Sequence, residues 1–275
     1  MAILQTTFLS VSLMRTVNIE VILPADKMQM DGTYMPAVPA YKTLYLLHGI
    51  FGSEKDWITR TNIVRYAEER NIAVIMPAGE NAFYTDQPEM HALYSQMISK
   101  DLVDVTRRMF PLSHRREDTF IGGLSMGGYG ALYNGLHHCD TFGRIIALST
   151  ADRTKAAIHM KDDSNILVSR SYFTRVLGGN LEGVEHSRYN IPTLAGLASK
   201  ENDCLPMIYL ACGTQDPLLE TNRNIRDALT SNGYSVDYHE TEGAHSWDFW
   251  DHHIHQALKW ITDKSEASMH SGNVL

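Results

Sequence analysis

Short apolar runs alternate with segments of helical periodicity along most of this 275-residue chain. The runs are apolar on both faces, which is typical of central parallel strands covered by helices on both sides. The segments between them carry apolar residues at helical spacing and end at proline or glycine. The alternation predicts an α/β fold with a mostly parallel central sheet and helices on both faces. The predicted strands are 44–47, 72–76, 119–121, 145–148, 207–210 and 234–240, and the predicted helices are 61–70, 98–109, 126–137, 217–231 and 247–261.

Several segments depart from this alternation. Residues 6–23 partly alternate and predict one or two strands at an antiparallel edge, whereas the proline-containing segment 24–41 predicts a loop. Residues 79–95 and 151–203 show no sustained periodicity, and we expect them to be insertions over one end of the sheet. Because α/β folds reach this length as one domain, we predict a single domain over 1–263 and a flexible tail over 264–275.

The charge balance excludes one class of function. The chain has 24 basic and 32 acidic side chains, a net charge of −8. A dedicated nucleic-acid binder needs a basic face, so we expect no nucleic-acid partner. No stretch approaches the roughly 20 apolar residues of a membrane span, and no basic residue precedes an apolar run at the N-terminus. We therefore predict a cytoplasmic protein without a membrane partner.

Cysteine and histidine usage raises the question of metal sites. The three cysteines, Cys139, Cys204 and Cys212, show no CxxC spacing, so neither a disulfide scaffold nor a zinc module is expected. Thirteen histidines are present, including a cluster at 252–255. This cluster lies on the predicted last helix, where we expect it on the solvated side. No partner spacing for a metal accompanies it, so no metal is predicted.

The clearest local motif is G-x-S-x-G at Gly123, Ser125 and Gly127, between a predicted strand and a predicted helix. This context is typical of the nucleophile elbow of α/β hydrolases. A serine in so tight a turn needs strained backbone geometry, and its neighbours have no room for side chains. The helix N-terminus and the Met126 N–H can then stabilise a developing oxyanion. A dinucleotide-binding loop is the rival interpretation, but Tyr133 stands where G-x-G-x-x-G needs its third glycine.

A serine nucleophile needs an imidazole base, and in this fold an acid and then the histidine follow the serine along the chain. His245 lies in a glycine-containing loop between the last predicted strand and helix, and we predict it as the base. Asp216 is the only carboxylate in the loop after strand 207–210, and we predict it as the acid. Its following proline also makes it a good helix cap, and both roles can hold. Asp203 and Asp237 remain as alternatives.

The segment His48-Gly49-Ile50-Phe51-Gly52 follows the first predicted central strand. Such a turn presents backbone N–H groups, and we predict the Ile50 amide as the second oxyanion donor beside Met126. His48 is expected to support the loop and not to react.

These motifs together resemble the esterase D-like branch of the α/β hydrolases, and within it the tributyrin esterase (acetyl esterase) and feruloyl esterase group. The resemblance runs from about residue 41 to 262. Its segments are Leu46-Leu47-His48-Gly49, Trp57 with Arg60-Thr61-Asn62, Met76-Pro77, Tyr84-Thr85-Asp86, Gly123–Gly130, Cys212-Gly213-Thr214-Gln215-Asp216 and Gly243-Ala244-His245-Ser246-Trp247.

The resemblance implies a serine carboxylesterase without a cofactor, in which Ser125, Asp216 and His245 form the triad. It implies short-chain acyl esters as substrates, acylated carbohydrates among them, with feruloyl or cinnamoyl esters as the alternative. Residues 151–203 would form a small cap that shapes the substrate pocket. Trp57 and Tyr84 are expected to bind substrate. Homo-oligomers are common in the group.

Two other functions remain open. An acyltransferase would use the same acyl-serine and pass the acyl group to an alcohol in place of water. A non-catalytic binding module would be expected to lack a triad residue, and all three are present.

Overall fold

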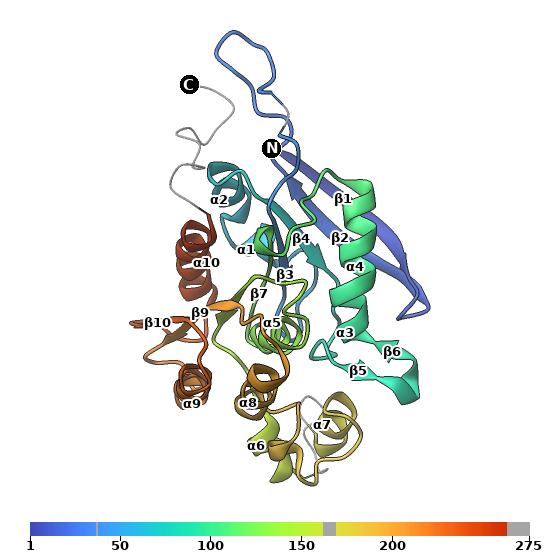
Figure 1. Cartoon of the computed structure of the whole chain (residues 1–275), viewed down its shortest axis with the longest axis vertical. Coiled ribbons are helices and arrows are strands. Elements are labelled where there is room, and N and C mark those ends of the chain that lie inside the picture. Colours follow the sequence, from blue (N-terminus) through green and yellow to red (C-terminus); the bar gives the residue numbers. More distant parts are fainter. Residues whose placement is uncertain (37, 162–168, 263–275) are drawn as a thin grey trace.

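The computed structural model describes residues 1–36, 38–161 and 169–262. Within these residues an eight-stranded sheet has the order β1-β2-β4-β3-β7-β8-β9-β10 (Figure 1). β1 and β2 pair antiparallel with each other and β2 pairs antiparallel with β4, whereas the neighbours from β4 to β10 are parallel. The strands are β1 Ala2–Ser10, β2 Arg15–Leu23, β3 Thr43–Leu47, β4 Ala73–Pro77, β7 Thr119–Leu124, β8 Arg144–Leu148, β9 Met207–Gly213 and β10 Val236–Thr241.

Helices cover both faces of this sheet. The α-helices are α1 Asp56–Arg60, α2 Ile63–Glu69, α3 Tyr94–Gln96, α4 Leu102–Met109, α5 Met126–His137, α6 Thr154–Ile158, α7 Arg170–Val176, α8 Ile191–Glu201, α9 Leu219–Ser231 and α10 Trp247–Ile261. A π-helical turn, Met97–Asp101, joins α3 to α4. The short elements are the hairpin β5 Asp86–Gln87 with β6 Ala92–Leu93, and the 3₁₀ turns Pro88–Met90, Arg116–Asp118 and Val184–His186.

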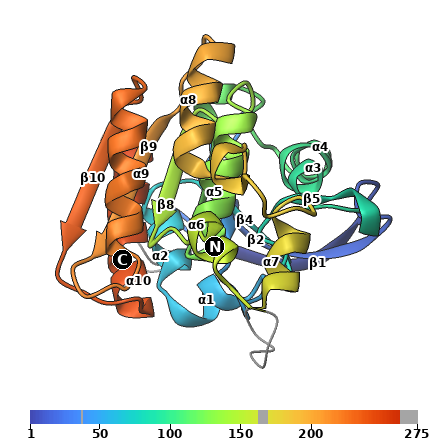
Figure 2. The ribbon, with the colours of Figure 1, turned by 90° about the horizontal axis from the view of Figure 1, so that it is seen from below.

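Alternating side chains of each central strand feed two separate cores. On β3, Leu44 and Leu46 pack with residues of α1, α2 and α10, whereas Tyr45 and Leu47 pack on the opposite face with residues of α4, α5, α8 and α9. The two layers of helices lie on opposite sides of the sheet in Figure 2. Because successive side chains of a strand enter opposite cores, the strands are apolar throughout. This arrangement confirms the predicted α/β fold with helices on both faces of the sheet.

One regular helix lies where the sequence pattern predicted only an aperiodic insertion. Helix α8 packs against α5 and α9 and is the crossover between β8 and β9. The side chain of Asn190 accepts a hydrogen bond from the Thr193 N–H, and Pro192 follows in the first turn. An Asn cap before a proline is a helix-start signal. The irregular part of 151–203 is therefore shorter than predicted and ends before α8.

The two segments without sustained periodicity are 79–95 and the part of 151–203 that precedes α8. They contact each other beside the first turns of α5. The Thr85 hydroxyl donates to the Val176 carbonyl at 2.5 Å, and the Tyr172 hydroxyl donates to the Asn81 carbonyl at 2.8 Å. Phe83 packs edge-on against Tyr129 of α5. These segments follow the carboxyl ends of β4 and β8, so they lie at the end of the sheet that carries Ser125. Residues 162–168 and the predicted tail at 264–275 lie outside the described residues.

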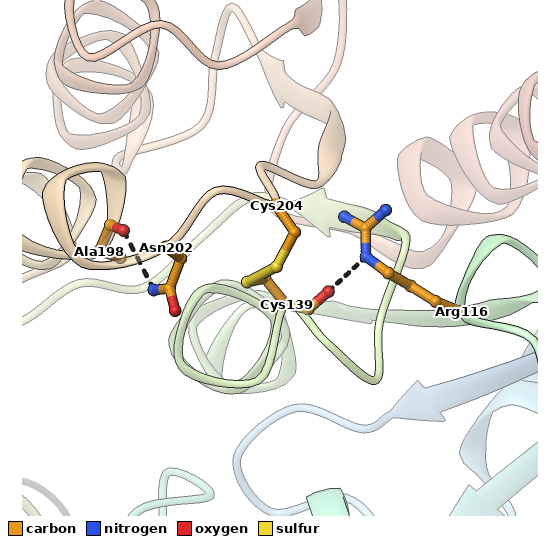
Figure 3. The surroundings of a disulfide bond; sticks show 5 residues. All are labelled: Arg116, Cys139, Ala198, Asn202 and Cys204. Carbon is orange, nitrogen blue, oxygen red and sulfur yellow. Dashed lines mark hydrogen bonds between the residues drawn. A yellow bond between two sulfur atoms is a disulfide. The ribbon is translucent and has the colours of Figure 1, made fainter.

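A disulfide joins Cys139 to Cys204, 65 residues apart, and Cys212 is buried and free. The cysteine spacing predicts no disulfide scaffold, and it gives no sign of this one bond, because two cysteines 65 residues apart leave no local pattern. Figure 3 shows the bond between the chain after α5 and the chain before β9, with the Arg116 Nε donating to the Cys139 carbonyl. Since Ser125 begins α5 and Cys139 follows its end, the bond lies about 18 Å or more from the serine.

One histidine of the 252–255 cluster also departs from expectation. His253 is buried and its ring nitrogens bond the hydroxyls of Tyr209 and Thr241, at 2.9 and 3.0 Å. Burial lowers the pKa of His253 to about 4, with repulsion from His252 and His239 adding to the effect. His253 is thus a neutral core residue and not part of a solvated face. Among the described residues no helix is long and apolar enough to cross a membrane.

Candidate active site

Ser125 lies at the turn between β7 and α5, with φ 54° and ψ −115°. This left-handed conformation is strained for a residue with a side chain, as predicted for the elbow. Backbone bonds hold it from the neighbouring strand: the Ser125 N–H donates to the Leu148 carbonyl at 2.8 Å, and the Ala151 N–H donates to the Ser125 carbonyl at 3.1 Å. Met126 is the first residue of α5, so its N–H is among those without a partner inside the helix. Ser125 therefore stands at the positive end of a helix.

The two motif glycines are required by close backbone contacts. A Cβ on Gly123 would lie 2.4 Å from the Gly127 carbonyl oxygen. One on Gly127 would lie 2.5 Å from the Leu47 carbonyl oxygen and 2.6 Å from that of His48. Both distances are far below van der Waals contact. The predicted lack of room beside the serine is confirmed, and the elbow packs directly on the loop after β3.

His245 lies in the loop between β10 and α10, within reach of both predicted partners. Its Nε2 is 3.1 Å from the Ser125 hydroxyl oxygen, and its Nδ1 is 2.9 Å from Asp216 Oδ2. Because a carboxylate only accepts, Nδ1 carries the proton and Nε2 is free to accept from the serine. The three residues form one continuous chain of hydrogen bonds. The alternative acids are elsewhere: Asp237 lies within β10 and Asp203 precedes β9.

Asp216 contacts the base as predicted but does not cap the next helix, because the N-cap of α9 is Leu218, without a side-chain cap. Its side chain is buried, Oδ2 faces His245, and Oδ1 accepts from the Leu218 N–H at 2.8 Å just before α9. Burial raises the pKa of Asp216, but hydrogen bonds from His245 and the Leu218 N–H outweigh it, and the net effect lowers the pKa. The group is thus an ionised carboxylate with donors on both oxygens.

The loops carrying the acid and the base are joined by one backbone hydrogen bond and by one from a backbone N–H to a side chain. The Gln215 N–H donates to the Gly243 carbonyl at 2.9 Å, and the Gly243 N–H donates to Gln215 Oε1 at 2.6 Å. A Cβ on Gly213 would lie 2.2 Å from the Gly243 carbonyl oxygen. Gly243 has φ 145°, which favours glycine. This pairing sets the distance between Asp216 and His245.

His48 supports the loop after β3, as predicted. It is buried; its Nε2 accepts from the Gly79 N–H at 2.9 Å, and its Nδ1 therefore donates to the Gly49 carbonyl at 2.7 Å. Burial lowers the pKa of His48, which keeps the ring neutral. Fixing the Gly49 carbonyl also fixes the Ile50 N–H, since both belong to one planar peptide unit. The loop lies against the elbow, with a Gly49 Cβ position 3.7 Å from the Ser125 Cβ.

The prediction that Trp57 and Tyr84 contact substrate is wrong. Both side chains are fully buried. The Trp57 Nε1 donates to the Leu47 carbonyl at 3.1 Å, and the Tyr84 hydroxyl donates to the His48 carbonyl at 3.0 Å. The His48 ring also donates to the Gly49 carbonyl. The carbonyls of three consecutive residues in this loop, Leu47, His48 and Gly49, therefore each accept a hydrogen bond from a ring-bearing side chain. The aromatic residues position the loop from beneath, which sequence alone does not distinguish from lining a pocket.

Two residues beside the acid and the base were not predicted from the sequence. Gln215 precedes Asp216 and accepts from the Gly243 N–H of the His245 loop, and the ring of Trp250 packs edge-on against the His245 ring, with 4.9 Å between the ring centroids. Only Gln215 could have been found from the sequence, because it is adjacent to the predicted acid. Within the described residues no cluster of three or more His, Cys, Asp or Glu side chains could hold a metal.

Known proteins show the same architecture over nearly the whole chain. A family model described as "Putative esterase" matches residues 10–261. The acetyl esterase of Caldicellulosiruptor saccharolyticus is 41% identical over 269 residues, which cover 97% of this chain and 100% of that protein. Two Staphylococcus aureus structures are 29% identical: the fluorophosphonate-binding serine hydrolase FphF, with a TM-score of 0.82 over 96% of this chain and 99% of that one, and the S-formylglutathione hydrolase FrmB, with 0.80 over 95% and 99%.

A match of the family model over most of the chain, together with a relative of this identity and coverage, shows the family. The fold, the mostly parallel sheet and the esterase D-like resemblance are all confirmed by it. The chain belongs to the esterase family of α/β hydrolases and is a carboxylic ester hydrolase.

Proposed function

We propose that Ser125, His245 and Asp216 are the catalytic triad of a serine carboxylesterase that acts on short-chain, acetyl-type esters. The single observation that carries the proposal is the continuous chain of hydrogen bonds from the Ser125 hydroxyl through His245 to the buried Asp216 carboxylate. A neutral imidazole between a hydroxyl and a carboxylate is the arrangement that activates a serine nucleophile.

The reaction has two halves that use the same groups. His245 Nε2 takes the Ser125 proton as the oxygen attacks the ester carbonyl, and the imidazolium then gives that proton to the departing alcohol. Water next attacks the acyl-serine, His245 removes its proton, and the carboxylic acid leaves as the proton returns to Ser125. The Ile50 and Met126 N–H groups are the donors for the oxyanion in both tetrahedral intermediates.

The short-acyl preference is supported by the relative named acetyl esterase, which aligns with this chain over its whole length. We further propose that residues 79–95, 151–161 and 169–186 border the substrate, because these segments contact each other beside α5 at the end of the sheet that carries Ser125. Acylated carbohydrates as the ester source and a homo-oligomeric state remain predictions from the sequence.

The test is a panel of p-nitrophenyl esters from acetyl to octanoyl, with methyl ferulate as a separate arm. We expect kcat/KM to be highest for acetyl to butyryl and to be abolished in Ser125→Ala. Equal activity of the variant and the wild type would contradict the triad, and a preference for methyl ferulate would assign the feruloyl alternative. Adding an alcohol and analysing the products distinguishes hydrolysis from acyl transfer.

Location is a separate question. The predicted cytoplasmic location meets one opposing observation, because disulfides persist mainly in oxidising compartments and the structure joins Cys139 to Cys204. Rapid alkylation of thiols in intact cells, followed by mass analysis, measures the state of this pair. Alkylated Cys139 and Cys204 would support the cytoplasm, and an intact bond would contradict it.

A further inference from the structure

The chain after β4 contacts the loop after β3 at two points. At the first, the Gly79 N–H donates to His48 Nε2 at 2.9 Å, and the other ring nitrogen of His48 donates to the Gly49 carbonyl. At the second, the Phe51 N–H donates to Asn81 Oδ1 at 2.8 Å. Because a backbone N–H only donates, the side-chain atom of Asn81 that faces it must be the oxygen.

These two contacts hold the peptide units on either side of Ile50. The Gly49 carbonyl and the Ile50 N–H belong to one planar unit, and the Ile50 carbonyl and the Phe51 N–H belong to the next. His48 binds the first unit and Asn81 binds the second. The Ile50 side chain also packs against the core on the α5 face of the sheet. Because both units are held, the two backbone dihedral angles between them are held as well, and with them the direction of the Ile50 N–H.

The turn that Asn81 binds is strained. The Gly52 N–H donates to the Gly49 carbonyl at 3.1 Å and closes a four-residue turn, in which Phe51 stands third with φ 63°. A left-handed third position favours glycine or asparagine, and another residue keeps it only when its surroundings impose it. Phe51 is 65% exposed, so packing of its ring contributes little. The hydrogen bond from its N–H to Asn81 is a contact that can hold this conformation.

Asn81 is itself fixed from the other side. Its backbone carbonyl accepts from the Tyr172 hydroxyl of α7 at 2.8 Å. Two residues further along the chain, the Phe83 ring packs edge-on against Tyr172 and against Tyr129 of α5, with centroids 6.2 and 5.5 Å apart. Asn81 is exposed, but the segment that carries it is thus anchored to the helix that begins at Ser125.

We propose that Asn81 is a positioning residue for ester hydrolysis, which holds the Ile50 N–H toward the oxyanion by binding the Phe51 N–H. The inference rests on the proposed triad and its oxyanion donors. With Asn81 in place, the Phe51 N–H is occupied and the Ile50 N–H is left for the substrate oxygen. Without it, the strained turn relaxes, the Ile50 N–H turns away, and the transition state loses part of its stabilisation.

A thiono ester distinguishes a displaced oxyanion donor from a displaced triad. p-Nitrophenyl thionoacetate carries C=S in place of the C=O of p-nitrophenyl acetate and releases the same p-nitrophenol. Because sulfur is a weak acceptor, the thiono ester gains less from the oxyanion N–H groups. The ratio of kcat/KM for the oxygen ester to kcat/KM for the thiono ester therefore reports the position of these donors, whereas a defect in the acid or the base lowers both values.

The experiment measures this ratio in Asn81→Ala and in Asn81→Asp, which keeps an acceptor for the Phe51 N–H. In Asn81→Ala we expect kcat/KM for p-nitrophenyl acetate to fall about three- to tenfold, the effect of one neutral hydrogen bond, and kcat/KM for the thiono ester to change less than about twofold. Asn81→Asp should keep the wild-type ratio. Because Asn81 is exposed, both variants should fold, and their melting temperatures check this.

Two further variants serve as controls. Asp31→Ala removes another exposed acceptor, whose Oδ1 binds the Thr33 N–H at 2.9 Å in the loop before β3, and it should match the wild type on both esters. Asp216→Asn should lower kcat/KM for both esters and leave their ratio unchanged. An unchanged ratio in folded Asn81→Ala, or an equal fall of the ratio in Asn81→Asp, would overturn the inference. Ser125→Ala run in parallel keeps the two proposals apart, because activity retained in that variant would contradict the triad itself.

Discussion

The two halves of the candidate site are built in different ways. On the nucleophile side, at the ends of β3 and β7, backbone lies against backbone, and Gly123 and Gly127 leave no room for a Cβ. On the acid and base side, at the ends of β9 and β10, side chains set the geometry: Asp216 bonds His245, and Gln215 Oε1 accepts from the Gly243 N–H. The serine is held by contacts between backbone atoms, and the histidine is held by a contact between side chains, so substitutions should affect the two halves differently.

The largest effect is expected on the side-chain half. Asp216→Asn should lower kcat about 10⁴-fold with little change in folding, because an amide can donate to Nδ1 and stabilise the wrong tautomer of His245. The control is Asp237→Asn, at a half-exposed carboxylate on β10 paired with His239, which should stay within twofold of the wild type. Steady-state kinetics at saturating ester measures both. A loss below tenfold for Asp216→Asn would remove this residue from the triad.

On the nucleophile side, one added methyl group should displace the turn that carries Ser125. In Gly127→Ala the new Cβ would meet the carbonyls of Leu47 and His48, so the elbow must move, at a cost of about 1–3 kcal/mol in the free energy of unfolding. A shift of the nucleophile of this kind costs about 10² in kcat. Urea unfolding and kinetics measure the two effects.

The matched glycine control is Gly196→Ala on α8, where the nearest atom to the new Cβ is Asn232 Oδ1 at 3.4 Å. Alanine is the better helix former, so this variant should equal or exceed the wild type in stability by up to about 1 kcal/mol. If Gly127→Ala behaved like Gly196→Ala, the close packing of the elbow on the β3 loop would be contradicted.

The last effect is on stability alone, with no change expected in activity at neutral pH, and it concerns the contacts of α10 with β9 and β10 in acid. His253 joins α10 to β9 and β10, and burial lowers its pKa from 6.5 to about 4. Because the unfolded chain binds this proton more readily, stability is highest above pH 6.5 and falls as the pH drops toward 4. At about pH 4.5 the wild type should have lost about 2–3 kcal/mol through this group.

Urea unfolding at about pH 7.5 and pH 4.5 checks this loss in His253→Gln, where the His253 contribution should disappear. The control is His114→Gln, an exposed histidine between α4 and β7 that does not contribute to the shift of His253, and this variant should keep the wild-type pH dependence. An equal pH dependence in His253→Gln and the wild type would show that the proton on His253 does not contribute.

The difference between the halves also explains what the sequence could predict. The elbow requires glycines at fixed positions around Ser125, so it leaves a local motif. The loop positions of Asp216 and His245 follow from strand–helix alternation, and the structure brings both to the serine. The central strands and most helices were predictable for the same reason, since burial on both faces gives continuous apolar runs.

Residues that act across long sequence distances left no such signal. Phe51 and Asn81 are 30 residues apart, and the partners of the disulfide are 65 apart. Trp57 and Tyr84 are predicted as substrate contacts because the sequence does not distinguish an aromatic side chain that supports a loop from one that lines a pocket. Helix α8 was the exception, because Asn190 before Pro192 is a readable helix start.

The most direct test of the triad is to locate the covalent adduct of a fluorophosphonate by peptide mass analysis. The Ser125 oxygen is the only serine oxygen bonded to the His245 Nε2 in the described residues, so one adduct per chain is expected, on the peptide that contains Ser125. The adduct should be absent in Ser125→Ala and should form much more slowly in Asp216→Asn. An adduct on another serine, or undiminished labelling of Ser125→Ala, would contradict the account.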